Sequence, residues 1–304
     1  MSNQTSFPSA LCRAKSLAGA ALIGLFVISA ARAQTTLPER IVAIGGAVTE
    51  TLYALGVEDR IVAVDTTAVY PPEARQKPNV GYMRAISAEG VLAQSPDLML
   101  IEEGAGPPNA LALLEVSGVP IETVPDGHAI DSIGTKIEVI AKAVGKPDEG
   151  KALSEAIEHD LATLKDELGS IERKRRVLFV LSIVDGRPMA AGHDTAADAM
   201  MRLAGGVNVF GEIEGYKTIS PESATELAPD VVVMMTGAGR DHQIRDPFAI
   251  PALAATPAGQ ANALIRMDAA YLLGFGPRTA QAARDLASRL YPGEIDAHAL
   301  GAAD

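Results

Sequence analysis

Cysteine is almost absent from this 304-residue sequence, and the single one, Cys12, lies ahead of an apolar stretch near the N-terminus. The residues after position 33 contain no thiol. Disulfide bonds, cysteine nucleophiles and thiolate metal sites are therefore excluded from that part of the chain. Its stability in an oxidising compartment has to come from packing.

Catalytic motifs are also missing. The sequence has no phosphate-binding glycine loop with lysine, no Gly-x-Ser-x-Gly elbow, no His-Glu-x-x-His pair and no cysteine cluster. A receptor for bare manganese or zinc would bring several imidazoles and carboxylates together, whereas the histidines here are scattered. They are His128, His159, His193, His242 and His298. We therefore expect a protein that is not an enzyme.

Cationic residues are outnumbered by acidic ones, 26 to 38. Removal of the first 33 residues would take away three cations and no acids, which leaves a formal charge of −15. A surface of this sign repels nucleic acid. We expect a monomer that does not bind nucleic acid.

The first 33 residues have the pattern of a signal peptide. Arg13 and Lys15 precede an uncharged stretch, residues 16–30, which ends in Ala-Arg-Ala at 31–33. The stretch is shorter than the roughly 20 residues that a membrane-spanning helix needs, and small residues at its end suit a signal peptidase. The pattern predicts cleavage near Gln34 and a periplasmic location, with an uncleaved anchor helix as the alternative.

Short β-branched runs alternate with amphipathic stretches in the rest of the chain. This pattern predicts two α/β lobes of Rossmann-like construction, with parallel sheets and a ligand cleft between the lobes. The expected strands are residues 40–44, 60–64, 98–101, 119–124, 176–181 and 231–235. The expected helices are residues 49–55, 131–144, 148–168 and 195–203.

The helix at 148–168 is the longest, with leucine and isoleucine at helical spacing, and we predict that it bridges the lobes. The predicted organisation is therefore an N-terminal lobe at 34–145, a bridging helix at 146–172 and a C-terminal lobe at 173–304. Because one long helix is stiff, we expect limited rigid-body movement of the lobes.

The two halves share a phrase of isoleucine, serine, glutamate, proline and aspartate, with ten positions from isoleucine to proline in both copies. The copies are Ile86, Ser87, Glu89, Pro96 and Asp97, and Ile219, Ser220, Glu222, Pro229 and Asp230. A serine at this place caps a helix, so one copy alone would mean little. Two copies indicate lobes of related construction.

The segment 65–82 follows a predicted strand, where α/β folds place binding residues. It contains Tyr70, followed by Pro71 and Pro72, and these prolines favour an extended backbone that holds the phenol away from the loop. Ordinary packing or a surface contact of an amphipathic tyrosine is the alternative.

Three phrases resemble the periplasmic haemin-binding proteins of bacterial haem importers. They are residues 65–72 (Asp-Thr-Thr-Ala-Val-Tyr-Pro-Pro), 80–90 (Val-Gly-Tyr-Met-Arg-Ala-Ile-Ser-Ala-Glu-Gly) and 271–278 (Tyr-Leu-Leu-Gly-Phe-Gly-Pro-Arg). The resemblance covers essentially the whole chain after position 33. The repeat alone would indicate only the wider class of cobalamin, siderophore and haem receptors.

The resemblance implies that Tyr70 binds the iron of ferric haem b, carried as cargo. A phenolate is a hard anionic oxygen that suits ferric iron, but forming it requires help from the metal and from a nearby cation. The resemblance assigns that cation to Arg240, in a loop whose residues depart from the family's phrase. A solvated loop cation is the alternative at that position.

Other pocket residues follow from the same resemblance. Tyr82 is expected to stack on or bond to the haem and Arg84 to meet a propionate, although either could simply support the loop. His193 is a candidate second axial ligand, or only a loop residue before a helix cap.

Glu89 and Glu222 are implied to dock against arginines of the permease, one from each lobe, unless both merely cap their helices. The predicted function is capture of haem and its delivery to an ABC-type permease with its cytoplasmic ATPase. An outer-membrane haem receptor system would be an indirect partner. A cobalamin or ferric-siderophore receptor is the alternative.

Overall fold

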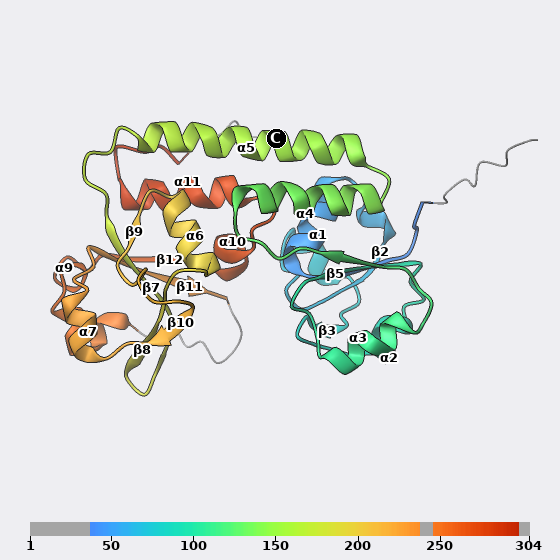
Figure 1. The fold of residues 1–304 in the computed structure, drawn as a ribbon, viewed down its shortest axis with the longest axis horizontal. Helices are drawn as coiled ribbons and strands as arrows, with labels where there is room; N and C mark the ends of the chain where they lie inside the picture. The colour runs from blue at the N-terminus through green and yellow to red at the C-terminus, as the bar shows by residue number, and fades with distance from the viewer. Residues whose placement is uncertain (1–36, 238–245, 298–304) are drawn as a thin grey trace, which may run out of the picture. The chain divides into compact units, whose positions relative to one another are not determined.

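The computed structural model describes residues 37–237 and 246–297. In the N-terminal half, four short strands form a fully parallel sheet with the order β2-β1-β5-β6 (Figure 1). These strands are β1 (Ile41–Ile44), β2 (Ile61–Val64), β5 (Leu98–Glu102) and β6 (Ile121–Val124). Their bounds confirm the four strands expected in this half to within two residues at each end.

Helices cover both faces of this sheet. Ile41 packs on one face with residues of α1 (Gly46–Ala54) and α4 (Ile130–Ala143), and Val42 packs on the other with α2 (Ala88–Leu92) and α3 (Pro108–Glu115). Alternate residues of one strand therefore enter two cores, which explains why the strand is apolar throughout. The rest of this half comprises η1 (Glu58–Arg60), η2 (Pro72–Gln76) and a hairpin of β3 (Gly81–Tyr82) and β4 (Ala85–Ile86).

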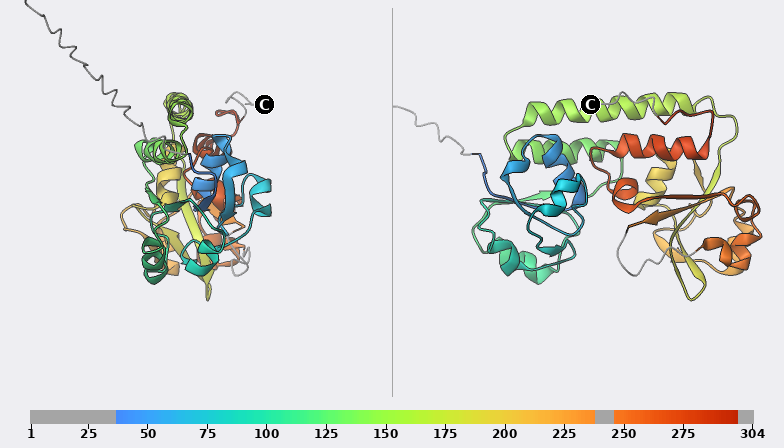
Figure 2. Two further views of the ribbon diagram at one scale, coloured as in Figure 1. Left: turned by 90° about the vertical axis from the view of Figure 1, so that its right-hand side faces the viewer. Right: turned by 180° about the vertical axis from the view of Figure 1, so that it is seen from behind.

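The long helix α5 (Pro147–Leu168) confirms the helix predicted at 148–168. It contacts α4 of the N-terminal half and α11 (Thr279–Leu290) of the C-terminal half (Figures 1 and 2). Its buried residues Ile157, Leu161 and Leu164 recur every three or four positions, so one face of the helix serves both contacts. The lobe boundaries at 145 and 173 stay a prediction.

The C-terminal half contains a mixed sheet with the order β10-β8-β7-β11-β12, with β9 also paired to β7. The strands are β7 (Arg176–Val184), β8 (Arg187–Ala191), β9 (Val207–Asn208), β10 (Tyr216–Thr218), β11 (Val231–Thr236) and β12 (Leu264–Asp268). β7 and β11 are parallel and confirm the strands predicted at 176–181 and 231–235, and β12, which was not predicted, runs parallel to β11. β8 is antiparallel to β7, and β10 is antiparallel to β8. Asp185 and Gly186, both at positive φ, form the tight turn that sends the chain back into β8.

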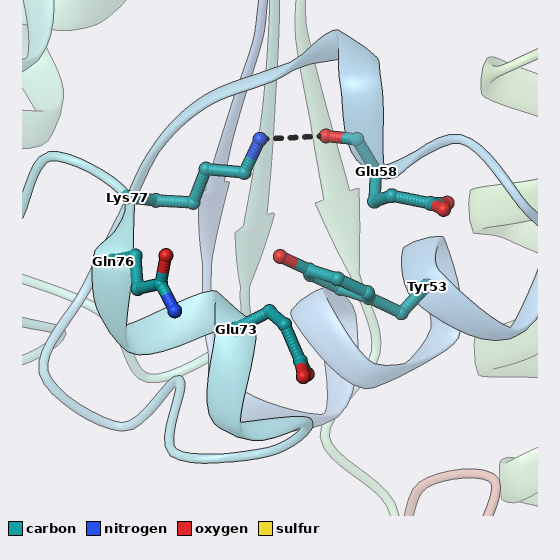
Figure 3. Close-up of a pocket in the computed structure, with 5 residues that line it drawn as sticks. All are labelled: Tyr53, Glu58, Glu73, Gln76 and Lys77. Atoms are coloured by element: carbon teal, nitrogen blue, oxygen red, sulfur yellow. Dashed lines mark hydrogen bonds between the residues drawn. The ribbon is translucent and has the colours of Figure 1, made fainter.

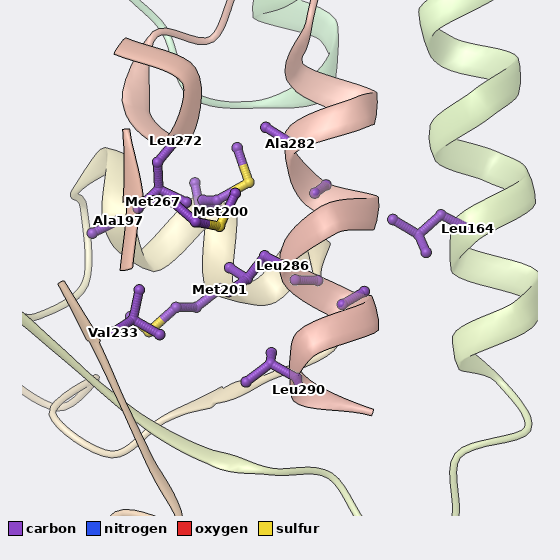
Figure 4. Packing of buried hydrophobic residues seen from close by; sticks show 14 of the residues in the cluster. Leu164, Ala197, Met200, Met201, Val233, Met267, Leu272, Ala282, Leu286 and Leu290 are labelled. Carbon is purple, nitrogen blue, oxygen red and sulfur yellow. The ribbon is translucent and has the colours of Figure 1, made fainter. Parts of the chain in front are cut away.

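One face of this sheet is covered by α6 (Ala196–Leu203), α10 (Ala269–Leu273) and α11 (Figure 4). Met200 and Met201 of α6 meet Leu286 of α11 in this core. The opposite core holds Ala224 of α7 (Pro221–Glu226), Leu253 of α8 (Pro251–Ala254) and Ala258 of α9 (Pro257–Gln260). The 3₁₀ helix η3 (Pro247–Ala249) precedes α8. The fold is thus the predicted α/β class with two lobes.

The repeated phrase forms the same hydrogen-bonded clamp in both halves. Asp97 accepts a bond from the backbone N–H of Arg40, and Asp230 accepts one from that of Arg176, at 2.9 and 3.0 Å. Each arginine side chain in turn donates to two backbone carbonyl oxygens in the segment that follows α2 or α7 and leads to the aspartate. The two lobes therefore share construction as well as sequence.

Across residues 37–237 and 246–297, no helix combines the length and the apolar character needed to cross a bilayer. The predicted signal peptide and the cleavage position near Gln34 lie outside these ranges.

A candidate tyrosine ligand site

The loop that carries Tyr70 is tied down at both ends by one buried carboxylate. Asp65 follows β2 and has no exposed surface. It accepts bonds from the N–H groups of Gly45 at 2.9 Å, Thr67 at 3.0 Å and Met83 at 3.1 Å, and from the Thr67 hydroxyl. Because Thr67 and Met83 lie on either side of Tyr70, this side chain fixes the path of the loop.

The loop also lies directly on the start of α1. A Cβ atom added at Gly46 would come within 2.8 Å of the Thr67 carbonyl oxygen, closer than such atoms approach one another. Glycine at position 46 is therefore required by the loop that lies against it.

Tyr70 itself is exposed. Its residue surface is 42% accessible, although the residues around it are held by hydrogen bonds such as that from Arg75 Nε to the Val69 carbonyl oxygen at 3.1 Å. The prediction that the following prolines present the phenol away from the loop agrees with this exposure.

The guanidinium group of Arg278 covers one face of the Tyr70 ring. Arg278 Cζ lies 3.6 Å from the ring centroid, well within the range of a cation–π contact. Arg278 lies immediately before α11 and is the last residue of the third phrase of the resemblance. The sequence analysis assigned it no function. It is the functional candidate that the sequence analysis missed.

Glu50 of α1 holds this guanidinium from the opposite half of the chain. Arg278 Nε donates to Glu50 Oε2 at 2.9 Å, and Nη2 donates to Oε1. Burial raises the pKa of Glu50, and the facing guanidinium opposes that rise. The pKa of Arg278 is raised, because the bonds and charge of Glu50 outweigh the burial that would lower it. The pair is therefore a charge-assisted fork.

Tyr271 is a second ring near the same cation, with its centroid 5.0 Å from Arg278 Cζ. Its hydroxyl donates to Asp285 Oδ2 at 2.8 Å. Burial, together with this bond and the charge of Asp285, raises the pKa of Tyr271 far above its ordinary value. Tyr271 therefore stays a protonated donor and is a poor candidate for an anionic ligand.

Tyr82 and Arg84 lie on the β3–β4 hairpin, at the far end of the Tyr70 loop. Both are exposed, Tyr82 by 46%. Within the described part of the chain, no hydrogen bond, ion pair or ring contact joins either of them to Tyr70. Their roles in a haem pocket stay predictions.

His193 follows β8, and its backbone pairs with Ile213 and Gly215. Its Nδ1 lies 3.0 Å from Asp194 Oδ2, and its side chain is 41% exposed. Thr195 caps α6, as the sequence suggested. In the described ranges no contact links the imidazole to Tyr70, so its role as a second axial ligand stays a prediction.

Arg240, the cation that the sequence analysis assigned to Tyr70, lies outside the described residues. The cation that the structure does bring to Tyr70 is Arg278. Only the folded chain reveals it, since its partner Glu50 is 228 positions away in sequence.

Glu89 and Glu222 occupy the same place in the two clamped repeats. Ser87 and Ser220 accept the capping bonds, from Gly90 and Ser223 respectively. Both glutamates are exposed one position after the start of their helices, and the N-cap side chain of each helix is a serine. Their shared exposure leaves them accessible to a partner.

A shallow pocket also lies beside the Tyr70 loop (Figure 3). Its lining comprises Tyr53, Glu58, Glu73, Gln76 and Lys77. Lys77 Nζ donates to the Glu58 carbonyl oxygen at 2.9 Å. Burial and the charges of the two glutamates raise the pKa of Tyr53, so this phenol stays neutral. The pocket does not include Tyr70.

No cluster of three or more His, Cys, Asp or Glu side chains that could hold a bare metal ion occurs within residues 37–237 or 246–297. The site that the structure assembles instead is one exposed phenol under a guanidinium.

Comparison with known proteins assigns the chain to a family. The family model described as "Periplasmic binding protein" matches residues 41–271. The chain belongs to the periplasmic binding protein family. One solved structure that resembles this chain is that of the periplasmic heme-binding protein RhuT from Roseiflexus sp. RS-1, which is 38% identical in sequence. The match covers 83% of this chain and 98% of RhuT, with a TM-score of 0.77.

Two further periplasmic binding proteins bear on the ligand. A periplasmic heme-binding protein from Pseudomonas aeruginosa is 32% identical over 84% of this chain and 94% of its own, with a TM-score of 0.78. The vitamin B12-binding protein of Yersinia pestis is 29% identical over 70% of this chain and 78% of its own. Such proteins bind a substrate for transport, and relatives of both ligand classes resemble this one.

Proposed function

We propose that the protein is a periplasmic substrate-binding protein that captures ferric haem b through Tyr70 and delivers it to an ABC-type permease. The observation that carries the proposal is the exposed phenol of Tyr70 beneath the guanidinium of Arg278, which lies 3.6 Å from the ring centroid. The 38% identity to a heme-binding protein over most of both chains supports the same ligand.

The chemistry of this pair suits ferric iron. A phenol is a poor ligand until it loses its proton, and a nearby cation favours the anionic form. Ferric iron prefers hard anionic oxygen and adds its own charge to the same effect. Arg278 supplies the cation, so Tyr70 can bind iron as a phenolate.

The remaining pocket residues complete the proposal. Arg84 is assigned to a haem propionate, and Arg240 to the surroundings of the iron-binding Tyr70. Tyr82 is assigned to contact with the haem macrocycle. His193 is assigned as a second axial ligand. If its Nδ1–H is bonded to Asp194, Nε2 remains free for a metal, the usual arrangement of a ligating histidine.

Delivery is assigned to Glu89 and Glu222, which would meet arginines of the permease from both lobes. Export through the predicted signal peptide would place the protein in the periplasm, as a monomer, where an outer-membrane haem receptor system would supply the ligand indirectly.

Titration of the purified protein with haemin and, separately, with cyanocobalamin tests the ligand. We expect saturable haemin binding with the charge-transfer band of a high-spin ferric phenolate, and no saturable binding of cyanocobalamin. Tyr53→Phe, which removes a phenol outside the site, should behave as wild type. A protein that binds cyanocobalamin and gives no haem spectrum would contradict the proposal.

A cobalamin receptor is the second candidate, because the Yersinia vitamin B12-binding protein is 29% identical to this chain. In that case Tyr70 would be part of a pocket wall and its replacement by phenylalanine would leave affinity nearly unchanged. The same two titrations separate the candidates.

A further inference from the structure

The segment 274–278 packs closely against α1. A Cβ atom added at Gly276 would lie 3.2 Å from Ala47 Cβ. Phe275 is 1% exposed, and its ring centroid lies 5.1 Å from that of His128 in the opposite half. This close approach places Arg278 beside Glu50, which lies one turn after Ala47 on the same helix.

Glu50 then determines where the guanidinium points. Both carboxylate oxygens of Glu50 accept bonds from Arg278, and the two side chains are 9% and 20% exposed. A planar fork with two parallel bonds fixes direction as well as distance. The guanidinium so held lies over the Tyr70 ring, with Arg278 Cζ 3.6 Å from the ring centroid.

Other charged groups near the pair do not replace this contact. Asp268, at the end of β12, raises the pKa of Glu50 by its charge and accepts a bond from the Tyr271 N–H. Tyr271 is bonded to Asp285. Among the described residues, Glu50 is the one carboxylate with a hydrogen bond to Arg278.

We infer that Glu50 is a positioning residue for the ligand tyrosine: its two bonds hold the Arg278 guanidinium over the Tyr70 ring. The inference rests on the proposed function. It adds a residue from α1 that touches neither iron nor haem and acts through Arg278. A protein lacking this carboxylate would keep both Tyr70 and Arg278 but lose their alignment.

The test compares Glu50→Gln, Arg278→Gln and the double variant, each loaded with haemin. Glu50→Gln should speed haem loss to an apomyoglobin trap by about tenfold, the scale of one charge-assisted bond. It should also shift the phenolate charge-transfer band in the same direction as Arg278→Gln. The double variant should lose haem no faster than Arg278→Gln alone, since Glu50 acts through Arg278. Glu50→Asp should fall between wild type and Glu50→Gln.

Three results would overturn the inference. Additive losses in the double variant would show that Glu50 acts independently of Arg278. An unchanged band in Glu50→Gln would show that Arg278 is held by other groups. Slower haem loss would show that Glu50 mainly offsets the charge of Arg278.

A haem-free measurement separates this inference from the proposed function. In the NMR spectrum of the ligand-free protein, Glu50→Gln should move the Tyr70 ring signals, identified by their loss in Tyr70→Phe. If wild type binds no haem, the function fails while this test still applies. If Glu50→Gln does not fold, Arg278→Lys carries both measurements, because an ammonium group cannot form the planar fork.

Discussion

At the residue scale, the path of the Tyr70 loop depends on Asp65, a carboxylate with no exposed surface. Asp65 accepts bonds from three backbone N–H groups and one hydroxyl while fully buried. Asp65→Asn would turn an NH₂ group towards N–H donors and leave at least one of them unpaired. We expect the free energy of unfolding to fall by about 2–3 kcal/mol, measured by urea denaturation.

The matched control for Asp65→Asn is Asp166→Asn, on an exposed position of α5. Its unfolding free energy should stay within about 0.5 kcal/mol of wild type. Equal stability of the two variants would mean that the bonds to Asp65 do not hold the loop.

Single residues also show what the sequence could and could not reveal. The exposure of Tyr70 agrees with its local setting, a strand end followed by two prolines, whereas its role as iron ligand came from the family resemblance and stays a prediction. Arg278 and Glu50 were not predictable, because they meet only through folding, 228 positions apart. A glutamate inside a helix and an arginine before one have no local feature that pairs them.

At the scale of elements, a bidentate ion pair joins α5 to α11. Arg284 has no exposed surface and donates to both carboxylate oxygens of Glu167 at 2.8 Å. The hydrogen bonds from Arg284 hold the pKa of Glu167 below its ordinary value. A lowered pKa means that this stabilisation is present above the ordinary value of 4.5 and is lost as pH falls through the folded-state pKa.

Glu167→Gln should therefore lower the free energy of unfolding by about 1–2 kcal/mol at neutral pH, a range that allows for screening of a partly exposed carboxylate. The difference from wild type should shrink as pH falls below 4.5, where the wild-type carboxylate takes up a proton. Urea denaturation across this range measures it. Glu155→Gln, in an exposed pair on the same helix, should have little effect at any pH. A difference that grew on acidification would contradict the assignment.

The duplicated clamps give a second prediction for elements. Asp230→Ala removes the bond to the Arg176 N–H and should cost about 1 kcal/mol of unfolding free energy. Asp97→Ala should cost at least as much, since it removes the equivalent bond from the Arg40 N–H and a second bond from the Glu39 N–H. Thermal or urea unfolding of both variants would show it. A loss confined to one variant would contradict the equivalence of the clamps.

Elements were predicted best where the pattern was strong. Six parallel strands and α5 followed from buried β-branched runs and helical spacing, and the related construction of the two lobes followed from the repeated phrase. The antiparallel strands β8 and β10 were missed because both are short and of mixed composition, and β10 lies at the edge of the sheet. The local signal for them was the Asp185-Gly186 pair, a typical hairpin turn.

At the scale of the whole molecule, capture and delivery are assigned to different surfaces. Glu89→Ala and Glu222→Ala should leave haem binding unchanged, while the double variant should abolish binding to the permease in vesicles or its stimulated ATP hydrolysis. The control is Glu155→Ala, which removes the same charge from α5. Normal delivery by the double variant, or impaired haem binding, would contradict the separation of roles.

The central claim is that Tyr70 holds the iron, and the absorption spectrum of the ferric haem complex tests it most directly in wild type, Tyr70→Phe and Tyr271→Phe. The account predicts a phenolate charge-transfer band in wild type and Tyr271→Phe, and its loss in Tyr70→Phe. Tyr70→Phe keeps the ring beneath Arg278 and removes only the oxygen. A band that persists in Tyr70→Phe would place the iron on another residue and contradict the account.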